Sequence, residues 1–213
     1  MDCPMTDLSL IETLRWQPNE GFIRLRLHLA RLSRSARRIG FPEPLDAAAK
    51  LEDALKGEHE PRRVRLTLDH QGHIDVTTAP FVPLPPDAVW TLRISNTRID
   101  SADRLLRIKT TRRGIYEAAR AEFTQQQADE VILLNERQEV CEGTITSVFL
   151  DDGTGILKTP PISCGLLAGV LRTELICQRK ARVGRITLDD LDNDTLYVGN
   201  SLRGLIRATL QKD

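Results

Sequence analysis

The hydrophobic pattern of the first eighty residues changes its period twice. Residues 8–16 predict a strand, and a turn at 17–21 leads into a second strand near 22–25. From Leu27 the apolar positions recur at helical spacing until residues 40–42, Gly-Phe-Pro, end the helix. We expect a second helix over 45–56. Two further strands, 62–68 and 73–78, are expected to form a hairpin.

The proline-rich segment 81–87 predicts a linker between two domains, 1–82 and 83–213. The elements expected after it are strands over 90–94, 131–134 and 196–199, helices over 112–125 and 167–177, a helical turn at 188–191 and, over 140–150, a strand or a bent pair. On the first of these helices Ile115, Ala119 and Phe123 are expected to point inward. The pattern therefore predicts an α+β chain of two small mixed domains.

Composition narrows the class of protein. The chain has 213 residues, with 30 Lys and Arg against 30 Asp and Glu, so no global charge attracts nucleic acid or an anionic membrane. No apolar run approaches the roughly 20 residues of a membrane span, and the N-terminus lacks a leader pattern. The four cysteines show no metal-ligand spacing and are expected to be reduced thiols. We expect a cytoplasmic protein without a bound metal.

An arginine-rich stretch at 24–38 first suggests nucleic-acid binding. At 3.6 residues per turn these arginines cover the whole polar side of the predicted helix, and no aromatic residue alternates with them. A solvated helix face is the simpler interpretation, and a nucleic-acid-binding module stays the minor alternative.

Three blocks in the second half carry candidate chemistry. Lys109 offers an amine, Glu142 lies among β-branched and apolar residues where an unpaired carboxylate is costly, and 159–172 predicts a strand end, a turn and a helix start. The free N–H groups of such a helix start can hold a phosphate. Pyridoxal 5'-phosphate needs these three features: an amine for its aldehyde, a carboxylate for its ring nitrogen and a phosphate cradle.

The order of these blocks resembles the class IV, or D-amino-acid-transaminase-like, family of pyridoxal-phosphate enzymes. The resemblance also covers Ile-Glu-Thr at 11–13, His-Leu-Ala-Arg-Leu at 28–32 and Gly-Asn-Ser at 199–201. It implies two α+β domains with the cofactor in the cleft between them, a homodimer and a small-molecule substrate. The cofactor-binding residues that it implies are Arg31 and Lys109, Glu142, Leu167, Gly169, Val170, Leu171 and Asn200.

Thr13 and Asn200 look like those of the 4-amino-4-deoxychorismate lyase branch, in which the threonine is implicated in catalysis. Leu171 stands where the family's transaminases usually carry threonine, and Ser147 where the family often has asparagine. The resemblance therefore implies a lyase that releases pyruvate and 4-aminobenzoate for folate synthesis, with a functional link to aminodeoxychorismate synthase. An aminotransferase for branched-chain or D-amino acids is the alternative.

Lys109, Glu142 and Thr13 are thus the predicted catalytic residues. A substrate carboxylate needs a cationic partner, and the sequence leaves its identity open among four arginines: Arg15, Arg107, Arg113 and Arg203.

Overall fold

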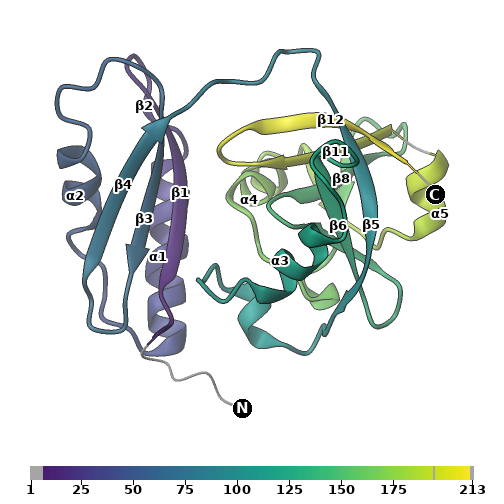
Figure 1. The fold of residues 1–213 in the computed structure, drawn as a ribbon, viewed down its shortest axis with the longest axis horizontal. Helices are drawn as coiled ribbons and strands as arrows, with labels where there is room; N and C mark the ends of the chain where they lie inside the picture. Colours follow the sequence, from purple (N-terminus) through teal and green to yellow (C-terminus); the bar gives the residue numbers. More distant parts are fainter. Residues whose placement is uncertain (1–6, 194, 212–213) are drawn as a thin grey trace. The chain divides into compact units, whose positions relative to one another are not determined.

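The computed structural model describes residues 7–193 and 195–211, which form two compact units (Figure 1). The first unit extends to Pro83 and also contains Ile108–Arg112; the second contains Leu84–Arg107 and the chain from Arg113 onward. The passage after Pro83 falls inside the proline-rich segment expected to be a linker. The segment Ile108–Arg112 lies in the first unit, whereas the sequence predicted a second domain continuous over 83–213.

The first unit is a four-stranded antiparallel sheet with two helices on one face (Figure 1). Its sheet order is β2-β1-β3-β4. The elements are β1 (Leu10–Gln17), β2 (Gly21–Phe22), α1 (Leu25–Ile39), α2 (Ala47–Asp53), β3 (Arg62–Leu68) and β4 (Ile74–Pro80).

Alternation along β1 explains how this unit forms its core. Leu10 and Leu14 are fully buried, as is Leu66 on the neighbouring strand, and Leu32 of α1 is buried with them. Since side chains of a strand alternate between its two faces, Glu12 lies on the same buried face as Leu10 and Leu14. A carboxylate is therefore built into the apolar layer beneath α1.

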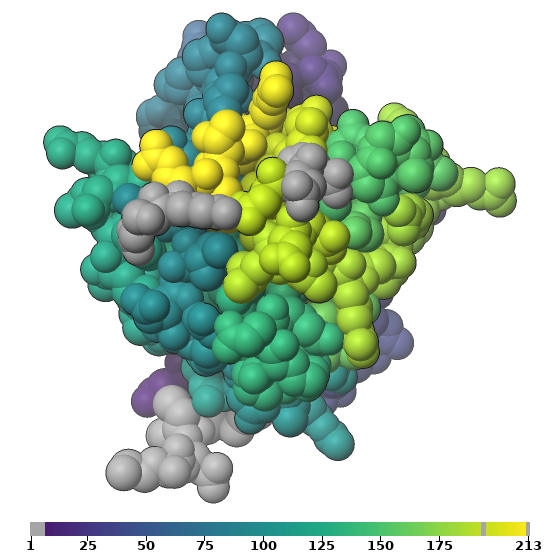
Figure 2. Space-filling model, turned by 90° about the vertical axis from the view of Figure 1, so that its right-hand side faces the viewer, coloured from purple at the N-terminus to yellow at the C-terminus, as the bar shows by residue number. Residues whose placement is uncertain are grey.

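The second unit is an eight-stranded mixed sheet of order β10-β9-β8-β11-β12-β5-β6-β7. Its strands are β5 (Val89–Ile99), β6 (Glu130–Asn135), β7 (Val140–Gly143), β8 (Ser147–Asp151), β9 (Leu157–Thr159), β10 (Ala181–Val183), β11 (Thr195–Asn200) and β12 (Gly204–Leu210). Its helices are η2 (Arg104–Arg107), α3 (Gly114–Ala121), η3 (Ile162–Cys164), α4 (Val170–Cys177) and α5 (Leu188–Asn193). Figure 2 shows the face of this unit on which β12 is yellow and the segment leading to α5 yellow-green.

An additional pairing between β7 and β8 closes the strands from β8 to β7 into a barrel. Every residue of β6 is buried, because Ile132 and Leu134 point into one apolar cluster and Val131 and Leu133 into another that includes α3. The strand expected over 131–134 is confirmed, and a continuous apolar run is typical of a strand buried on both faces. Among the described residues, no helix combines the length and the hydropathy needed to cross a membrane.

The structure differs from the sequence prediction mainly at element ends. Helix α1 begins at Leu25, where a strand was expected to continue, after Arg24 takes a left-handed conformation with φ 60°. Helix α4 begins at Val170, three residues later than predicted, and α3 is shorter than 112–125. The stretch 140–150 is the bent pair β7 and β8. The sequence missed β12 entirely, and Tyr116 rather than Ile115 is the buried side chain at the start of α3.

Candidate active site

Lys109 lies in the first unit, on a short segment that runs beside β1. The backbone N–H of Ile11 donates to the Lys109 carbonyl at 2.9 Å, and the N–H of Thr111 donates to the Ser9 carbonyl at 2.9 Å. Thr110 forms an isolated antiparallel bridge with Leu10. The lysine is half-buried, and its backbone is held by the strand that carries Glu12 and Thr13.

Glu12, His28 and Arg31 form a buried charged cluster between β1 and α1. Arg31 Nε donates to Glu12 Oε1 at 2.8 Å, and Arg31 Nη2 donates to Glu12 Oε2 at 2.6 Å. His28 Nδ1 lies 2.6 Å from Glu12 Oε2. Through Nε and Nη2, the Arg31 guanidinium therefore binds a carboxylate of its own unit. The resemblance assigns this guanidinium to the cofactor phosphate. The phosphate role of Arg31 stays a prediction.

The ionisation of this cluster follows from its contacts. Burial alone would raise the pKa of Glu12, but Arg31 and His28 outweigh burial and lower the pKa to about 2. Burial lowers the pKa of His28 despite the opposing effect of Glu12, so the ring is neutral at neutral pH and its Nδ1 donates to the carboxylate. Glu12 is thus a carboxylate whose charge is balanced by Arg31.

Thr13 is half-buried on the opposite face of β1 from Glu12 and lies across from Arg65 of β3. Its strand neighbour Ile11 is the residue that donates to Lys109. The predicted catalytic hydroxyl and the predicted catalytic amine therefore come from adjacent segments of one unit.

Glu142 lies in the second unit, on β7, and is 6% exposed. Its Oε1 accepts a hydrogen bond from the Tyr116 hydroxyl at 2.8 Å and one from the Leu167 backbone N–H at 3.2 Å. The outward-facing position that a strand glutamate commonly takes does not apply here. A buried carboxylate held on one oxygen by two donors can pair with a cation in the site.

The predicted phosphate cradle lies at the start of α4. Gly169 precedes the helix, and a Cβ there would come 2.7 Å from Ser147 Oγ, so any other residue would require the serine side chain to move. The first-turn N–H groups of Val170 and Leu171 have no acceptor within the helix itself, which is the usual basis of anion binding at this end. The Leu171 side chain is buried with Phe149 and Leu175.

Leu167 connects this cradle to Glu142. Its backbone N–H donates to Glu142 and its carbonyl accepts from Gly169 N–H at 2.9 Å. The predicted pyridinium partner and the predicted phosphate site therefore belong to one continuous network within the second unit.

Asn200 has its side chain engaged in a turn. Its Nδ2 donates to the Ile145 carbonyl at 3.2 Å, and its Oδ1 accepts from the Arg203 N–H at 3.0 Å. These bonds tie β11 to the loop that follows Glu142. They give Asn200 a structural role beside the predicted cofactor role.

The four candidate arginines lie in different surroundings. Arg15 is 5.7 Å from the Phe81 ring centroid, and Arg203 is 5.7 Å from that of Trp90. Arg113 stacks on Tyr116 and donates to the Thr144 carbonyl at 2.6 Å. Among the described residues, the Nε atoms of Arg15 and Arg107 are buried without a hydrogen-bond partner, which leaves them able to donate to an anion.

The sequence analysis missed a fully buried carboxylate, Glu130 on β6. It accepts hydrogen bonds from the hydroxyls of Thr144 and Thr146, at 2.6 and 2.8 Å, and from the backbone N–H of Val131, Thr144 and Ile145. A Cβ on Gly143 would come 2.7 Å from this carboxylate. Glu130 therefore fixes the loop between β7 and β8. Its place directly before the apolar run 131–134 was the feature of the sequence that could have identified it as a buried carboxylate.

Two other omissions had visible signals. Glu12 alternates with Leu10 and Leu14, which places it on the buried face of β1. Tyr116 lies three residues before Ala119 at helical spacing, so a face through 116, 119 and 123 was as consistent with the pattern as one through Ile115.

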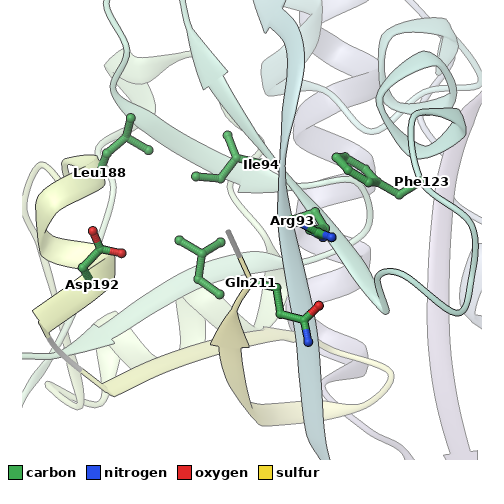
Figure 3. A pocket seen from close by; sticks show the side chains of 7 residues that line it. Arg93, Ile94, Phe123, Leu188, Asp192 and Gln211 are labelled. Carbon is green, nitrogen blue, oxygen red and sulfur yellow. The ribbon is translucent and has the colours of Figure 1, made fainter. Parts of the chain in front are cut away.

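A pocket of about 330 Å³ lies elsewhere in the second unit (Figure 3). It is lined by Arg93, Ile94, Phe123, Leu188, Asp192, Leu210 and Gln211. In Figure 3 Ile94 and Leu188 lie on one side of β5 and Phe123 on the other. None of the predicted site residues lines this pocket.

This architecture and site define a pyridoxal-phosphate enzyme, and comparisons with known proteins identify the family. The model of the amino-transferase class IV family matches residues 9–210. The chain is 51% identical to a Mesorhizobium loti protein provisionally named an amino-acid aminotransferase, and the two structures match with a TM-score of 0.94. The match covers 96% of this chain and 100% of the Mesorhizobium loti chain. The chain belongs to the class IV aminotransferase family.

More distant structures share the fold. The 4-amino-4-deoxychorismate lyase of Pseudomonas aeruginosa is 22% identical with a TM-score of 0.80, covering 96% of this chain and 83% of its own. The branched-chain amino acid aminotransferase of Escherichia coli is 18% identical with a TM-score of 0.78, and the match covers 95% of this chain and 76% of the Escherichia coli chain. No curated protein matches the chain significantly.

The family is enzymatic and depends on pyridoxal phosphate, and a Mycobacterium tuberculosis relative of the same fold has been solved in a form with this cofactor bound. The residues of the second unit fit the group. Glu142 offers a buried carboxylate to a protonated ring nitrogen, and the glycine-initiated turn of α4 offers N–H groups to a phosphate. A cofactor position in the cleft between domains stays a prediction, as do the individual site assignments.

Proposed function

We propose that the protein is a pyridoxal-phosphate-dependent aminodeoxychorismate lyase that releases pyruvate and 4-aminobenzoate. The observation that carries the proposal is the half-buried Thr13, on the strand whose Ile11 N–H donates to the Lys109 carbonyl. Elimination needs one group to remove a proton and a second to deliver one near the leaving group. Lys109 and Thr13 provide both from one unit.

The reaction assigns a separate task to each residue. When bound, the cofactor supplies an electron sink for the bond-breaking step. The Lys109 amine removes the proton from the ring carbon next to the substrate nitrogen. Thr13 delivers a proton as the bond to the enolpyruvyl oxygen breaks, pyruvate leaves and the remaining ring becomes aromatic. The amino group stays on the product, so no nitrogen is transferred.

The substrate is a dicarboxylate, and two of the candidate arginines suit it. The buried Nε atoms of Arg15 and Arg107 lack a hydrogen-bond partner among the described residues. A buried donor without a partner is costly unless a ligand satisfies it. We therefore favour Arg15 and Arg107 over Arg113, whose Nη2 already binds the Thr144 carbonyl.

Leu171 supports a lyase over a transaminase. Its side chain is 3% exposed and packs with Phe149 and Leu175, so it offers no hydroxyl to a phosphate. The transaminases that the chain resembles usually carry threonine at this position. The proposal also includes a homodimer in the cytoplasm, a place in folate synthesis and a functional link to aminodeoxychorismate synthase.

An aminotransferase for branched-chain or D-amino acids is the second candidate. The 51% identity to the Mesorhizobium loti protein, which is provisionally named an amino-acid aminotransferase, favours it. The same Lys109 and Glu142 would serve that reaction.

Two assays of the purified protein with bound cofactor separate the candidates. We expect pyruvate release from aminodeoxychorismate, followed by a coupled dehydrogenase, and little amino-group exchange between amino acids and 2-oxoglutarate. Thr13→Val should lower lyase turnover about 10²-fold, the scale of one lost proton-transfer group, with an unchanged cofactor spectrum. Thr13→Ser, which keeps the hydroxyl, is the matched control. Brisk transamination of leucine or D-alanine, with no pyruvate release, would establish the second candidate instead.

A further inference from the structure

We propose that Tyr116 is a positioning residue that holds the Glu142 carboxylate ionised and correctly oriented for the ring nitrogen of the cofactor. The inference rests on the cofactor role of Glu142 within the proposed function. It adds a residue of α3 to the predicted site.

Two donors from different elements fix the same oxygen of Glu142. The Tyr116 hydroxyl donates to Oε1 at 2.8 Å from α3, and the Leu167 N–H donates to it at 3.2 Å from the segment before α4. A carboxylate held on one oxygen from two directions loses much of its rotational freedom. Its second oxygen is then presented in one direction, which suits pairing with a ring N–H.

The Tyr116 ring is itself held in place. It is buried in an apolar cluster with Leu106, Ala119 and Leu133. The Arg113 guanidinium lies 4.8 Å from the ring centroid and is anchored by its bond to the Thr144 carbonyl. The hydroxyl therefore has a defined position before any ligand binds.

The surroundings of this pair favour a protonated Tyr116 hydroxyl. Burial and then the Glu142 carboxylate raise the pKa of Tyr116, so the hydroxyl remains a donor over the working pH range. Asp103 and Arg113 also act on Tyr116, while Arg172 and Cys141 interact electrostatically with Glu142. Arg172, 4% exposed on α4, is a cation that interacts electrostatically with Glu142.

The test replaces the hydroxyl alone. Tyr116→Phe keeps the packed ring and removes the bond to Glu142, so ionised Glu142 becomes less stable. A charge-assisted hydrogen bond corresponds to about one pH unit in the protonation of its acceptor. We expect the acid-side transition in the visible spectrum of the bound cofactor, titrated without substrate, to move up by about one pH unit, with about tenfold lower turnover at neutral pH.

Two further measurements distinguish positioning from general support of the fold. Tyr197→Phe, at a half-buried tyrosine on β11, is the matched control and should leave the transition unchanged. In a Glu142→Gln background, Tyr116→Phe should add less than twofold to the loss of turnover, because the two residues act as one unit. Thermal unfolding of each variant checks that the fold is kept.

The outcomes separate this inference from the proposed function. A protein that binds no cofactor would refute the proposed function itself. If the cofactor binds and Tyr116→Phe titrates like the wild type, Tyr116 is a packing residue and the inference is wrong. Additive losses in the double variant would equally refute it, whichever reaction the enzyme catalyses.

Discussion

The two units bury carboxylates in opposite ways. In the first, Glu12 is bound by the Arg31 guanidinium on both oxygens and contacted by His28. In the second, Glu130 is fully buried and accepts two threonine hydroxyls and three backbone N–H groups. One charge is balanced by a cation, and the other is solvated by dipoles.

The difference indicates what each carboxylate can do. In a pair such as Glu12 and Arg31 the two charges balance each other, and the pair fixes the position of α1 on β1. Hydroxyl and N–H donors, by contrast, bring no compensating positive charge to a carboxylate. Glu142 accepts hydrogen bonds from donors of the second kind, the Tyr116 hydroxyl and the Leu167 N–H, and Arg172 also interacts with it electrostatically.

Lys109→Ala gives the largest expected effect and tests the role of the first unit in the chemistry. No other amine in a family motif can replace it, so the covalent link to the cofactor should disappear and turnover should fall by several powers of ten. Borohydride reduction and peptide mapping locate the link in the wild type. Lys158→Ala, at a lysine 3.3 Å from Asp190, is the control. A reduced pyridoxyl group on Lys158 would overturn the assignment.

Glu12→Gln tests the cation-balanced carboxylate. It leaves Arg31 buried without its counter-charge, so the free energy of unfolding should fall by about 3–5 kcal/mol in urea denaturation. Glu60→Gln, at an exposed position, should change it by less than about 0.5 kcal/mol. A loss for Glu12→Gln as small as that control would mean that the pair adds nothing to the fold.

The same pair has a pH signature. The folded pKa of Glu12 is lowered to about 2 from 4.5, so its contribution to stability is present above pH 4.5 and is lost as pH falls toward 2. Stability of the wild type should therefore fall more steeply than that of Glu12→Gln between these values. Parallel curves would contradict the lowered pKa.

Glu142→Gln tests the carboxylate that is predicted to pair with the cofactor ring. A neutral amide cannot stabilise a protonated ring nitrogen, so turnover should fall by about 10²–10³-fold while cofactor stays bound. Absorbance of the bound cofactor and steady-state rates measure the two effects separately. Near wild-type turnover would make Glu142 a structural strand residue, and the contrast between the two units would lose its functional meaning.

Glu130→Gln gives the smallest expected effect and sharpens the comparison. The amide nitrogen cannot accept the hydrogen bonds that one carboxylate oxygen now receives, so about 1–3 kcal/mol of stability should be lost. This is less than for Glu12→Gln because no cation is left unpaired. Chemical denaturation of the two variants side by side gives the order, and a reversed order would refute the distinction.

Sequence patterns predicted much of the fold because the apolar periods are strong. The hairpin of β3 and β4 and the fully buried β6 were confirmed, since both depend on local alternation or a continuous apolar run. Strand β12 was missed although it forms a hairpin with β11 and its residues alternate in burial; its parallel pairing with the distant β5 leaves no signal in the local sequence.

The sequence identified the candidate site residues that lie in motifs, but it did not identify the residues that contact and hold them. Motif spacing identified Lys109, Glu142 and Gly169, whose assignments as site residues stay predictions. It could not show that Arg31 binds Glu12 or that Tyr116 reaches Glu142, because these contacts join residues 19 and 26 positions apart. Only the folded packing of helix on strand brings them together.

The segment Ile108–Arg112 has a consequence for dissecting the protein. Beside β2, it covers the edge of β1 that β3 does not, through the bonds at Ile11 and Thr111. A fragment ending at Pro83 would keep every helix and strand of the first unit but expose the backbone of residues 9–11 as an open edge, a template for pairing between molecules. During synthesis, the first unit likewise stays incomplete until the ribosome has added the lysine segment from beyond the linker.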